Sequence, residues 1–205
     1  MGGAARLRLC LPLYFGYRPA IRGLKGYWEA ADRVGRDRNP FRAGYLQLVA
    51  ISDTDAQAEA DYADAAAYFY HRCLHVPDYF FAAPGYVTPE SKQAAQTPFS
   101  TDSLQSLRWK DMVDEGYIIA GSPATVRERL REIVRELNVG HLIVLCQFGN
   151  LSRETTLRNT DLYAREVMPH LKDLWSEWTD RWSPQPLARP PRALGAAPLP
   201  AVAEV

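Results

Sequence analysis

Three short apolar runs are spaced along the chain, and a segment with helical periodicity follows each of them. In residues 7–14 leucines alternate with other residues, which predicts a strand with one apolar face that stops near Tyr14. Pro12 has no backbone N–H to donate, so we expect it at the C-terminal end of this strand or at a bulge. Residues 43–51 are apolar almost throughout, as in a parallel strand covered on both faces. Residues 141–148 form the third predicted strand.

The segments between these runs carry helix start and stop signals. After the first run, Tyr27, Ala31 and Val34 share a helical face that ends at Gly35. After the second, Thr54 and Gln57 form a predicted capping box, in which the hydroxyl accepts from the Gln57 backbone and the amide reaches back to Thr54. That helix should extend to about Leu74.

The clearest helix begins at Ser122 as N-cap, with Pro123 at the first helical position. Gly140 ends its connection to the third strand. Its predicted buried stripe is Val126, Leu130, Ile133, Val134 and Leu137. A last helix is predicted over residues 153–174, with Leu157, Leu162, Val167 and Leu171 as buried candidates.

Strands that alternate with helices imply parallel pairing and right-handed crossovers, which predicts an α/β fold. Three strands are too few to close a barrel, which needs eight, and an open sheet leaves its edges unpaired and one apolar face uncovered. We therefore expect an incomplete α/β domain over residues 1–182. Residues 183–205 are rich in Pro and Ala without any period, which predicts a disordered tail.

Composition narrows the classes of partner and the compartment. Lys and Arg together number 24, as do Asp and Glu, so no overall charge favours nucleic acid or an anionic membrane. An odd number of cysteines and the absence of a long apolar run favour a reduced, cytoplasmic protein. His71 and His75 share a helical face, but Arg72 stands where a zinc protease has Glu, so we expect no metal site.

Several stretches resemble the C-terminal region of luciferase-like flavin monooxygenases. The specific ones are 117–126, 140–149 and 163–169, with weaker similarity at 109–113, 52–56 and 11–14. The resemblance covers about Leu7 to Leu174. It implies that the three strands are the sixth, seventh and eighth of a (β/α)8 TIM barrel. It also implies that reduced FMN, supplied by a flavin reductase, reacts with O2 at the carboxyl end of the barrel to oxygenate a small organic substrate.

The same resemblance implies that parts of the barrel are missing from this chain. The first five strands, and the phosphate-binding loop expected before the sixth, have no counterpart in it. We therefore expect either a partner chain that completes the barrel or a homo-oligomer. The alternative is a non-catalytic half-barrel that serves as an interaction or dimerisation module, or an inactive fragment. NADPH, F420 and free reduced flavin all stay open as the source of electrons.

The resemblance also places the candidate site residues. Pro12, Leu13 and Tyr14 would border the flavin at the mouth of their strand, although Tyr14 could equally be a boundary tyrosine. Trp109 matches a tryptophan near the isoalloxazine, and its rival role is packing of a loop onto the barrel. Gln147 and Phe148 would face the substrate, with a turn amide bonded to backbone as the alternative for Gln147. The segment after Trp109 is shorter than the mobile lid of the luciferases, which argues against light emission from a long-chain aldehyde.

Overall fold

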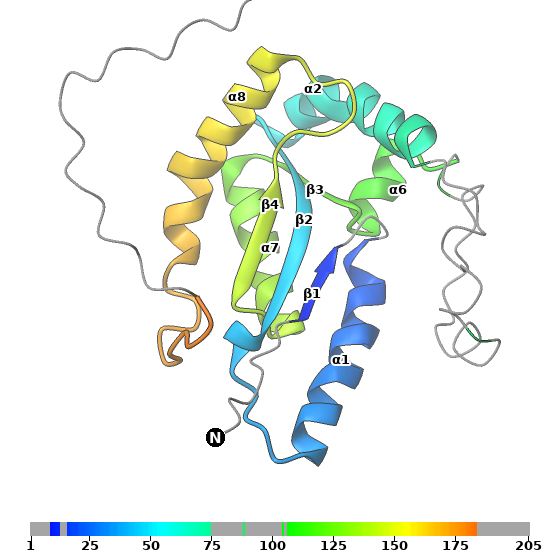
Figure 1. The fold of residues 1–205 in the computed structure, drawn as a ribbon. Helices are drawn as coiled ribbons and strands as arrows, with labels where there is room; N and C mark the ends of the chain where they lie inside the picture. Colours follow the sequence, from blue (N-terminus) through cyan, green and yellow to red (C-terminus); the bar gives the residue numbers. More distant parts are fainter. Residues whose placement is uncertain (1–8, 13–15, 75–87, 89–103, 105, 184–205) are drawn as a thin grey trace, which may run out of the picture.

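The computed structural model describes residues 9–12, 16–74, 88, 104 and 106–183. In these residues four parallel strands form one sheet: β1 (Leu9–Pro12), β2 (Ala43–Ile51), β3 (Ile118–Gly121) and β4 (His141–Leu145) (Figure 1). β2 is central, since β1 pairs with its first half, β3 with its second half and β4 with Gly44–Leu48. The α/β class and the parallel pairing predicted from the sequence are confirmed, and β2 has the predicted bounds.

β3 was not predicted as a strand. Its four residues are too few to show a period of two, and only pairing with Leu48–Ile51 of β2 makes it a strand. β4 stops at Leu145, three residues earlier than predicted, because a side chain and not a strand bonds the carbonyl of Cys146. Pro12 ends β1 as predicted, while residues 7, 8, 13 and 14 lie outside the described part of the chain.

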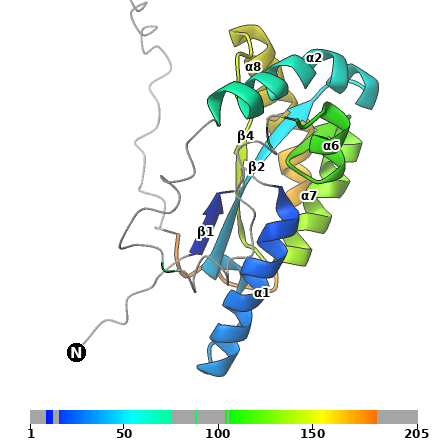
Figure 2. The same ribbon diagram turned by 90° about the vertical axis from the view of Figure 1, so that its right-hand side faces the viewer.

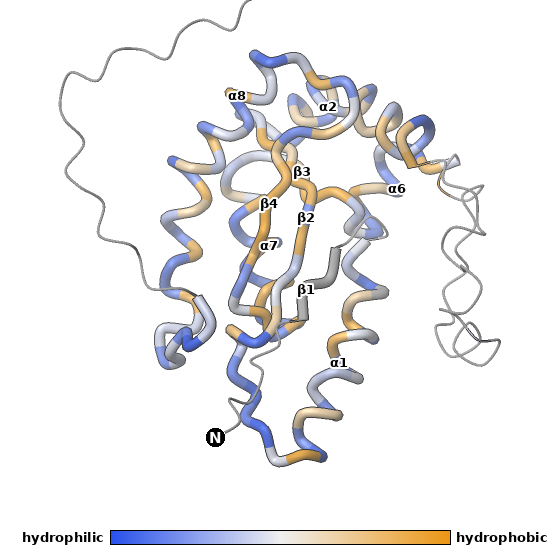
Figure 3. Tube along the Cα trace, in the orientation of Figure 1, coloured by the Kyte–Doolittle hydropathy of each residue, from blue (hydrophilic) through white to orange (hydrophobic). Residues whose placement is uncertain are grey.

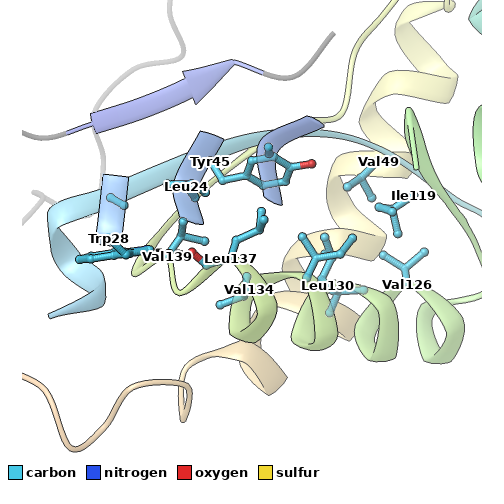
Figure 4. Packing of buried hydrophobic residues seen from close by; sticks show 14 of the residues in the cluster. Leu24, Trp28, Tyr45, Val49, Ile119, Val126, Leu130, Val134, Leu137 and Val139 are labelled. Atoms are coloured by element: carbon cyan, nitrogen blue, oxygen red, sulfur yellow. Dashed lines mark hydrogen bonds between the residues drawn. The ribbon is translucent and has the colours of Figure 1, made fainter. Parts of the chain in front are cut away.

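Two helices cover one face of the sheet, α1 (Tyr17–Arg33) and α7 (Pro123–Leu137) (Figure 2). The side chains buried beneath them form the first core cluster, and Figure 4 shows part of it. The Trp28 indole N–H donates to the carbonyl of Leu137 at 3.2 Å and ties the two helices together. The labelled members in Figure 4 are Leu24, Trp28, Tyr45, Val49, Ile119, Val126, Leu130, Val134, Leu137 and Val139.

The start signals and the buried stripe of α7 are confirmed, while its C-cap is the left-handed Asn138, which was not predicted. The Thr125 N–H donates to Ser122 Oγ at 3.3 Å, Pro123 takes the first helical position, and all five stripe residues are buried. The prediction for α1 was partly wrong. Gly35 does adopt a left-handed φ of 65° after the helix, but Val34 is 68% exposed because the helix has already ended at Arg33.

α2 (Asp55–Tyr68) runs into a π-helical turn (Phe69–Cys73) and lies at the carboxyl end of the sheet, with the short α6 (Trp109–Asp114) nearby (Figure 1). Thr54 caps α2, but the amide of Gln57 donates to Asp61 at 2.6 Å and does not return to Thr54. The reciprocal half of the predicted box was therefore wrong, because an ionised carboxylate one turn ahead is the stronger acceptor. Together these helices and the carboxyl half of the sheet bury the second core cluster, which consists of Leu48, Ala50, Ala58, Tyr62, Ala65, Ala66, Tyr70, Leu104, Met112, Ile118 and Phe148.

The last helical segment is broken into three. α8 (Arg153–Leu162) continues as a π-helical turn (Tyr163–Val167) and a 3-10 turn (Met168–Leu171) that contains Pro169, which cannot donate a backbone hydrogen bond. Val167 is buried as predicted and Leu162 and Leu171 are half-buried, but Leu157 is 53% exposed, so its predicted burial was wrong. The Pro- and Ala-rich tail from residue 184 lies outside the described residues.

One part of the sheet stays uncovered by the described helices. Ile143 of β4 is 47% exposed. Its register partner on β2, Leu46, is half-buried, and so is Leu145, two residues further along β4. The helices α1 and α7 lie on the opposite side of the sheet, and α2 covers only its carboxyl end (Figure 2). Figure 3 shows that β4 is apolar along most of its length. Among the described residues, β4 pairs with β2 alone.

Candidate functional site

The carboxyl ends of β2 and β4 are joined by one side chain, Asn159 of α8. Asn159 is fully buried, and its Nδ2 donates to the carbonyls of Val49 at 2.7 Å and Cys146 at 2.8 Å. Its Oδ1 accepts from the Ile51 N–H at 2.9 Å. Asn159 thus satisfies the backbone where the two strands separate. Sequence reasoning missed this residue, because an asparagine in a polar helix gives no sign of being buried.

A polar network surrounds the end of β2. Ser52 Oγ donates to Asp61 at 2.5 Å, and Gln57 donates to the other oxygen of that carboxylate. The Arg158 guanidinium bonds Asp53 at 2.8 Å and Asp61 at 3.4 Å. These contacts hold α2 and α8 against the sheet end. They also occupy the guanidinium with two carboxylates, so it has little capacity left for an anionic ligand.

A second link runs between the starts of α2 and α7. Asp55 accepts a hydrogen bond from the Ser122 N–H at 2.6 Å and one from Thr125 Oγ1 at 3.1 Å. The backbone hydrogen bond from Ser122 is the main cause that lowers the pKa of Asp55. Gly121 precedes Ser122 with φ of 140°, and a Cβ there would stand 2.5 Å from Asp55 Oδ1. The close approach of these two helix starts therefore requires glycine.

Trp109, the first residue of α6, is half-buried and packs against the second core cluster. It also borders a pocket of about 430 Å³ between α2, α6 and the end of β3. The other residues that line this pocket are Asp55, Ala56, Glu59, Lys110, Val113, Asp114, Ala120 and Thr125. Gln147 and Phe148 are not among them, so this pocket does not bring the three candidates together.

Gln147 and Phe148 have different surroundings at the end of β4. Gln147 is exposed, and its amide has no hydrogen-bond partner within the described part of the chain. The alternative of a turn amide bonded to backbone is therefore not what the described residues show. Phe148 is 2% exposed, and its ring centroid lies 6.1 Å from that of Tyr62. Its ring therefore packs in the core. Leu13 and Tyr14 lie outside the described residues, and only the backbone of Pro12 is described.

The described residues do not by themselves fit the phosphate of FMN. A phosphate needs several converging donors, such as backbone N–H groups, Arg or Lys. The described carboxyl end carries Asp53, Asp55 and Asp61, and the nearby Arg158 is bonded to two of these carboxylates, Asp53 and Asp61. A phosphate site would have to come from other segments.

Two further properties bear on the class of site. The described residues contain no group of three or more His, Cys, Asp or Glu side chains placed to hold a metal ion. Of the predicted helical pair, the His71 ring lies 3.0 Å from the carbonyl of Leu107, and His75 lies outside the described residues. No helix in the described ranges is long and apolar enough to cross a bilayer.

Solved structures share this fold. The monooxygenase RslO1 from Streptomyces bottropensis superposes with a TM-score of 0.54 at 16% identity, over 81% of this chain and 42% of its own. The oxygenating constituent of 3,6-diketocamphane monooxygenase from Pseudomonas putida, in complex with FMN, gives 0.52 at 21% identity, over 78% of this chain and 42% of its own. The chain thus spans about two fifths of the length of each. No curated protein is similar enough to count as a match.

The sequence itself matches a family model described as luciferase-like monooxygenase. The match covers residues 17–141, more than half of the chain, from the start of α1 to the first residue of β4. It includes the central strand β2 and the α2, α6 and α7 segments that surround the carboxyl end of the sheet. The chain therefore belongs to the luciferase-like monooxygenase family.

Proposed function

We propose that this chain is part of an FMN-dependent monooxygenase, which uses reduced FMN and O2 to oxygenate a small organic substrate in the cytoplasm. The observation that carries the proposal is the family match from α1 to the start of β4. The FMN complex of the Pseudomonas putida protein, which shares the fold, supports a flavin over other cofactors. FMN supplies the redox chemistry when bound. A separate flavin reductase supplies it in reduced form.

In this proposal the residues of the chain bind, orient and exclude water. Three residues border the flavin from the end of β1: Pro12, Leu13 and Tyr14. Trp109 borders it as well, as the resemblance to the family implies. Gln147 presents its exposed amide to the substrate as both donor and acceptor. Phe148 supports that position from beneath, because it is buried against Tyr62.

We further propose that other βα units complete a TIM barrel over the open part of the sheet. Ile143 and the unpaired side of β4, among the described residues, are where such strands would pack and pair. The similar structures are more than twice as long as the part that matches. These units would come from a longer polypeptide, a partner chain or a second copy of this chain, and they would carry the phosphate site.

The second candidate function is a non-catalytic half-barrel that acts as an interaction or dimerisation module. The same open face supports it, because an exposed apolar strand favours association whether or not a flavin is bound. The two candidate functions differ in whether the assembled protein contains bound flavin.

The deciding experiment isolates the protein from its own cells through a C-terminal tag placed at the chromosomal gene. Mass spectrometry of the tagged material identifies any additional sequence or partner chain, and its absorbance reports bound flavin. We expect the tagged material to contain bound FMN. Tagged material that holds no flavin, and that retains none after incubation with FMN and gel filtration, would favour the non-catalytic module.

A further inference from the structure

The pocket beside Trp109 has a lining that differs from a flavin phosphate site. Of its described lining side chains, three are carboxylates, Asp55, Glu59 and Asp114, and one is a cation, Lys110. Lys110 Nζ lies 2.5 Å from Asp114, so these two largely neutralise each other. Two negative charges remain in a pocket whose volume, about 430 Å³, is in the range of small-molecule sites.

The two remaining carboxylates differ in how they are engaged. Asp55 accepts hydrogen bonds from Ser122 and Thr125 at the start of α7, where the helix dipole offsets part of its charge. Glu59 lies one turn further along α2 and is exposed. Among the described residues it has no ion pair and no hydrogen bond. Glu59 is thus the carboxylate in the pocket that a bound cation could pair with most directly.

The rest of the lining is apolar and aromatic. Ala56, Val113 and Ala120 contribute small apolar surfaces, and the half-buried Trp109 contributes an indole ring. An indole is the strongest cation–π partner among side chains, and it also stacks on apolar bodies. A hard metal ion prefers six to eight oxygen ligands, and this pocket does not offer them. An apolar wall beside a free carboxylate suits an organic cation better.

We propose that this pocket binds a small organic ammonium ion, with its charged group at Glu59 and its apolar body against Trp109. The ligand class is a protonated primary amine on a compact hydrocarbon or aromatic group. The site stands on the pocket geometry of α2, α6 and β3, and it needs no flavin. Its success or failure can therefore be distinguished from that of the proposed monooxygenase activity.

The test uses the full chain and three probes of one shape: benzylamine, which is cationic at pH 7, neutral benzyl alcohol, and anionic benzoate. Binding is measured by isothermal titration calorimetry. We expect benzylamine to bind with a dissociation constant of about 1 mM or below, and benzyl alcohol at least about 5-fold more weakly. Benzoate should give no binding. Equal affinity for the amine and the alcohol, or no binding of benzylamine up to about 10 mM, would overturn the proposal.

Two variants and a matched control locate the site. Glu59→Gln removes the charge at an exposed position and should weaken benzylamine binding about 3- to 10-fold without changing the melting temperature. Trp109→Leu should weaken it by a similar factor. Glu154→Gln, at an exposed position on α8, should leave it unchanged. In the wild-type 1H–15N spectrum, the indole peak that Trp109→Leu deletes should shift when benzylamine is added. Unaltered binding by Glu59→Gln would show that the amine binds elsewhere.

Discussion

Asn159 takes the place of a strand partner where β2 and β4 part, through three hydrogen bonds to backbone groups of Val49, Ile51 and Cys146. Asn159→Ala leaves those buried groups unpaired, and we expect it to lower the free energy of unfolding by about 2–4 kcal/mol in urea denaturation. Asn150→Ala, which truncates an exposed asparagine, should cost less than about 0.5 kcal/mol. Equal losses in the two variants would mean that the Asn159 bonds carry no stability of their own.

The lowered pKa of Asp55 leads us to expect that the stability of the fold depends on pH. The Ser122 N–H holds the folded pKa of Asp55 below its ordinary value, so its stabilisation is present above the unfolded pKa, about 4, and is lost as pH falls through the folded value. Asp55→Asn should destabilise the protein by at most about 1 kcal/mol at pH 7, because the group is exposed. That difference should close as the pH is lowered below about 4. Asp64→Asn, elsewhere on α2, should show neither effect, and a difference for Asp55→Asn that persists at pH 2 would contradict the charge-based account.

At the scale of the elements, α7 and α8 differ in whether their leucines are buried. Leu130 is fully buried in the first core cluster, whereas Leu157 is 53% exposed, because Asn159 and not a leucine is the fully buried side chain of α8. Leu130→Ala should therefore lower the free energy of unfolding by about 3 kcal/mol, through lost burial and a cavity. Leu157→Ala should change it by less than about 0.5 kcal/mol. Thermal and urea unfolding of the pair measure the difference, and a large cost at Leu157 would indicate that another surface covers α8 in solution.

At the scale of the whole molecule, the open part of the sheet favours association. Ile143 is exposed on β4, whose other edge has no strand partner among the described residues. We expect the purified chain to self-associate, and Ile143→Lys to shift it toward monomer in light scattering, since a charge on the open face opposes pairing. Leu157→Lys places the same charge on an exposed helix and should leave the distribution unchanged. A monomeric wild-type chain would show that the face is already covered.

Retention of the cofactor is also a property of the whole molecule. Arg158, at the described carboxyl end, is paired with Asp53 and Asp61, so we expect it to give the phosphate of FMN little binding energy. Ring contacts alone must then offset the cost of immobilising the ligand. We expect a fluorescence titration of the purified chain to show no FMN binding at micromolar concentration. Tight binding by a monomer would refute the proposal that further βα units carry the phosphate site.

Local sequence patterns determined those helices and strands that are specified by residues close together in the chain. The apolar run of β2, the stripe of α7 and its Ser122-Pro123 start were all predicted, because periodicity and caps involve residues within one or two turns. The stretches around 117–126 and 140–149 led to the family. By contrast, β3 is a strand only because β2 lies beside it, and a four-residue run carries no period of its own.

Only the tertiary structure decided the composition of the candidate site. Asn159 reaches Ile51 across 108 residues and Asp55 reaches Ser122 across 67, and nothing local marks either pair. Trp109 was singled out by resemblance, but its acidic pocket is assembled from α2, α6 and β3, which are separate in the chain. Leu157 and Val34 have apolar side chains at helical spacing and are nevertheless exposed. Burial depends on which surfaces meet after folding, and a pattern along one helix does not record what lies opposite it.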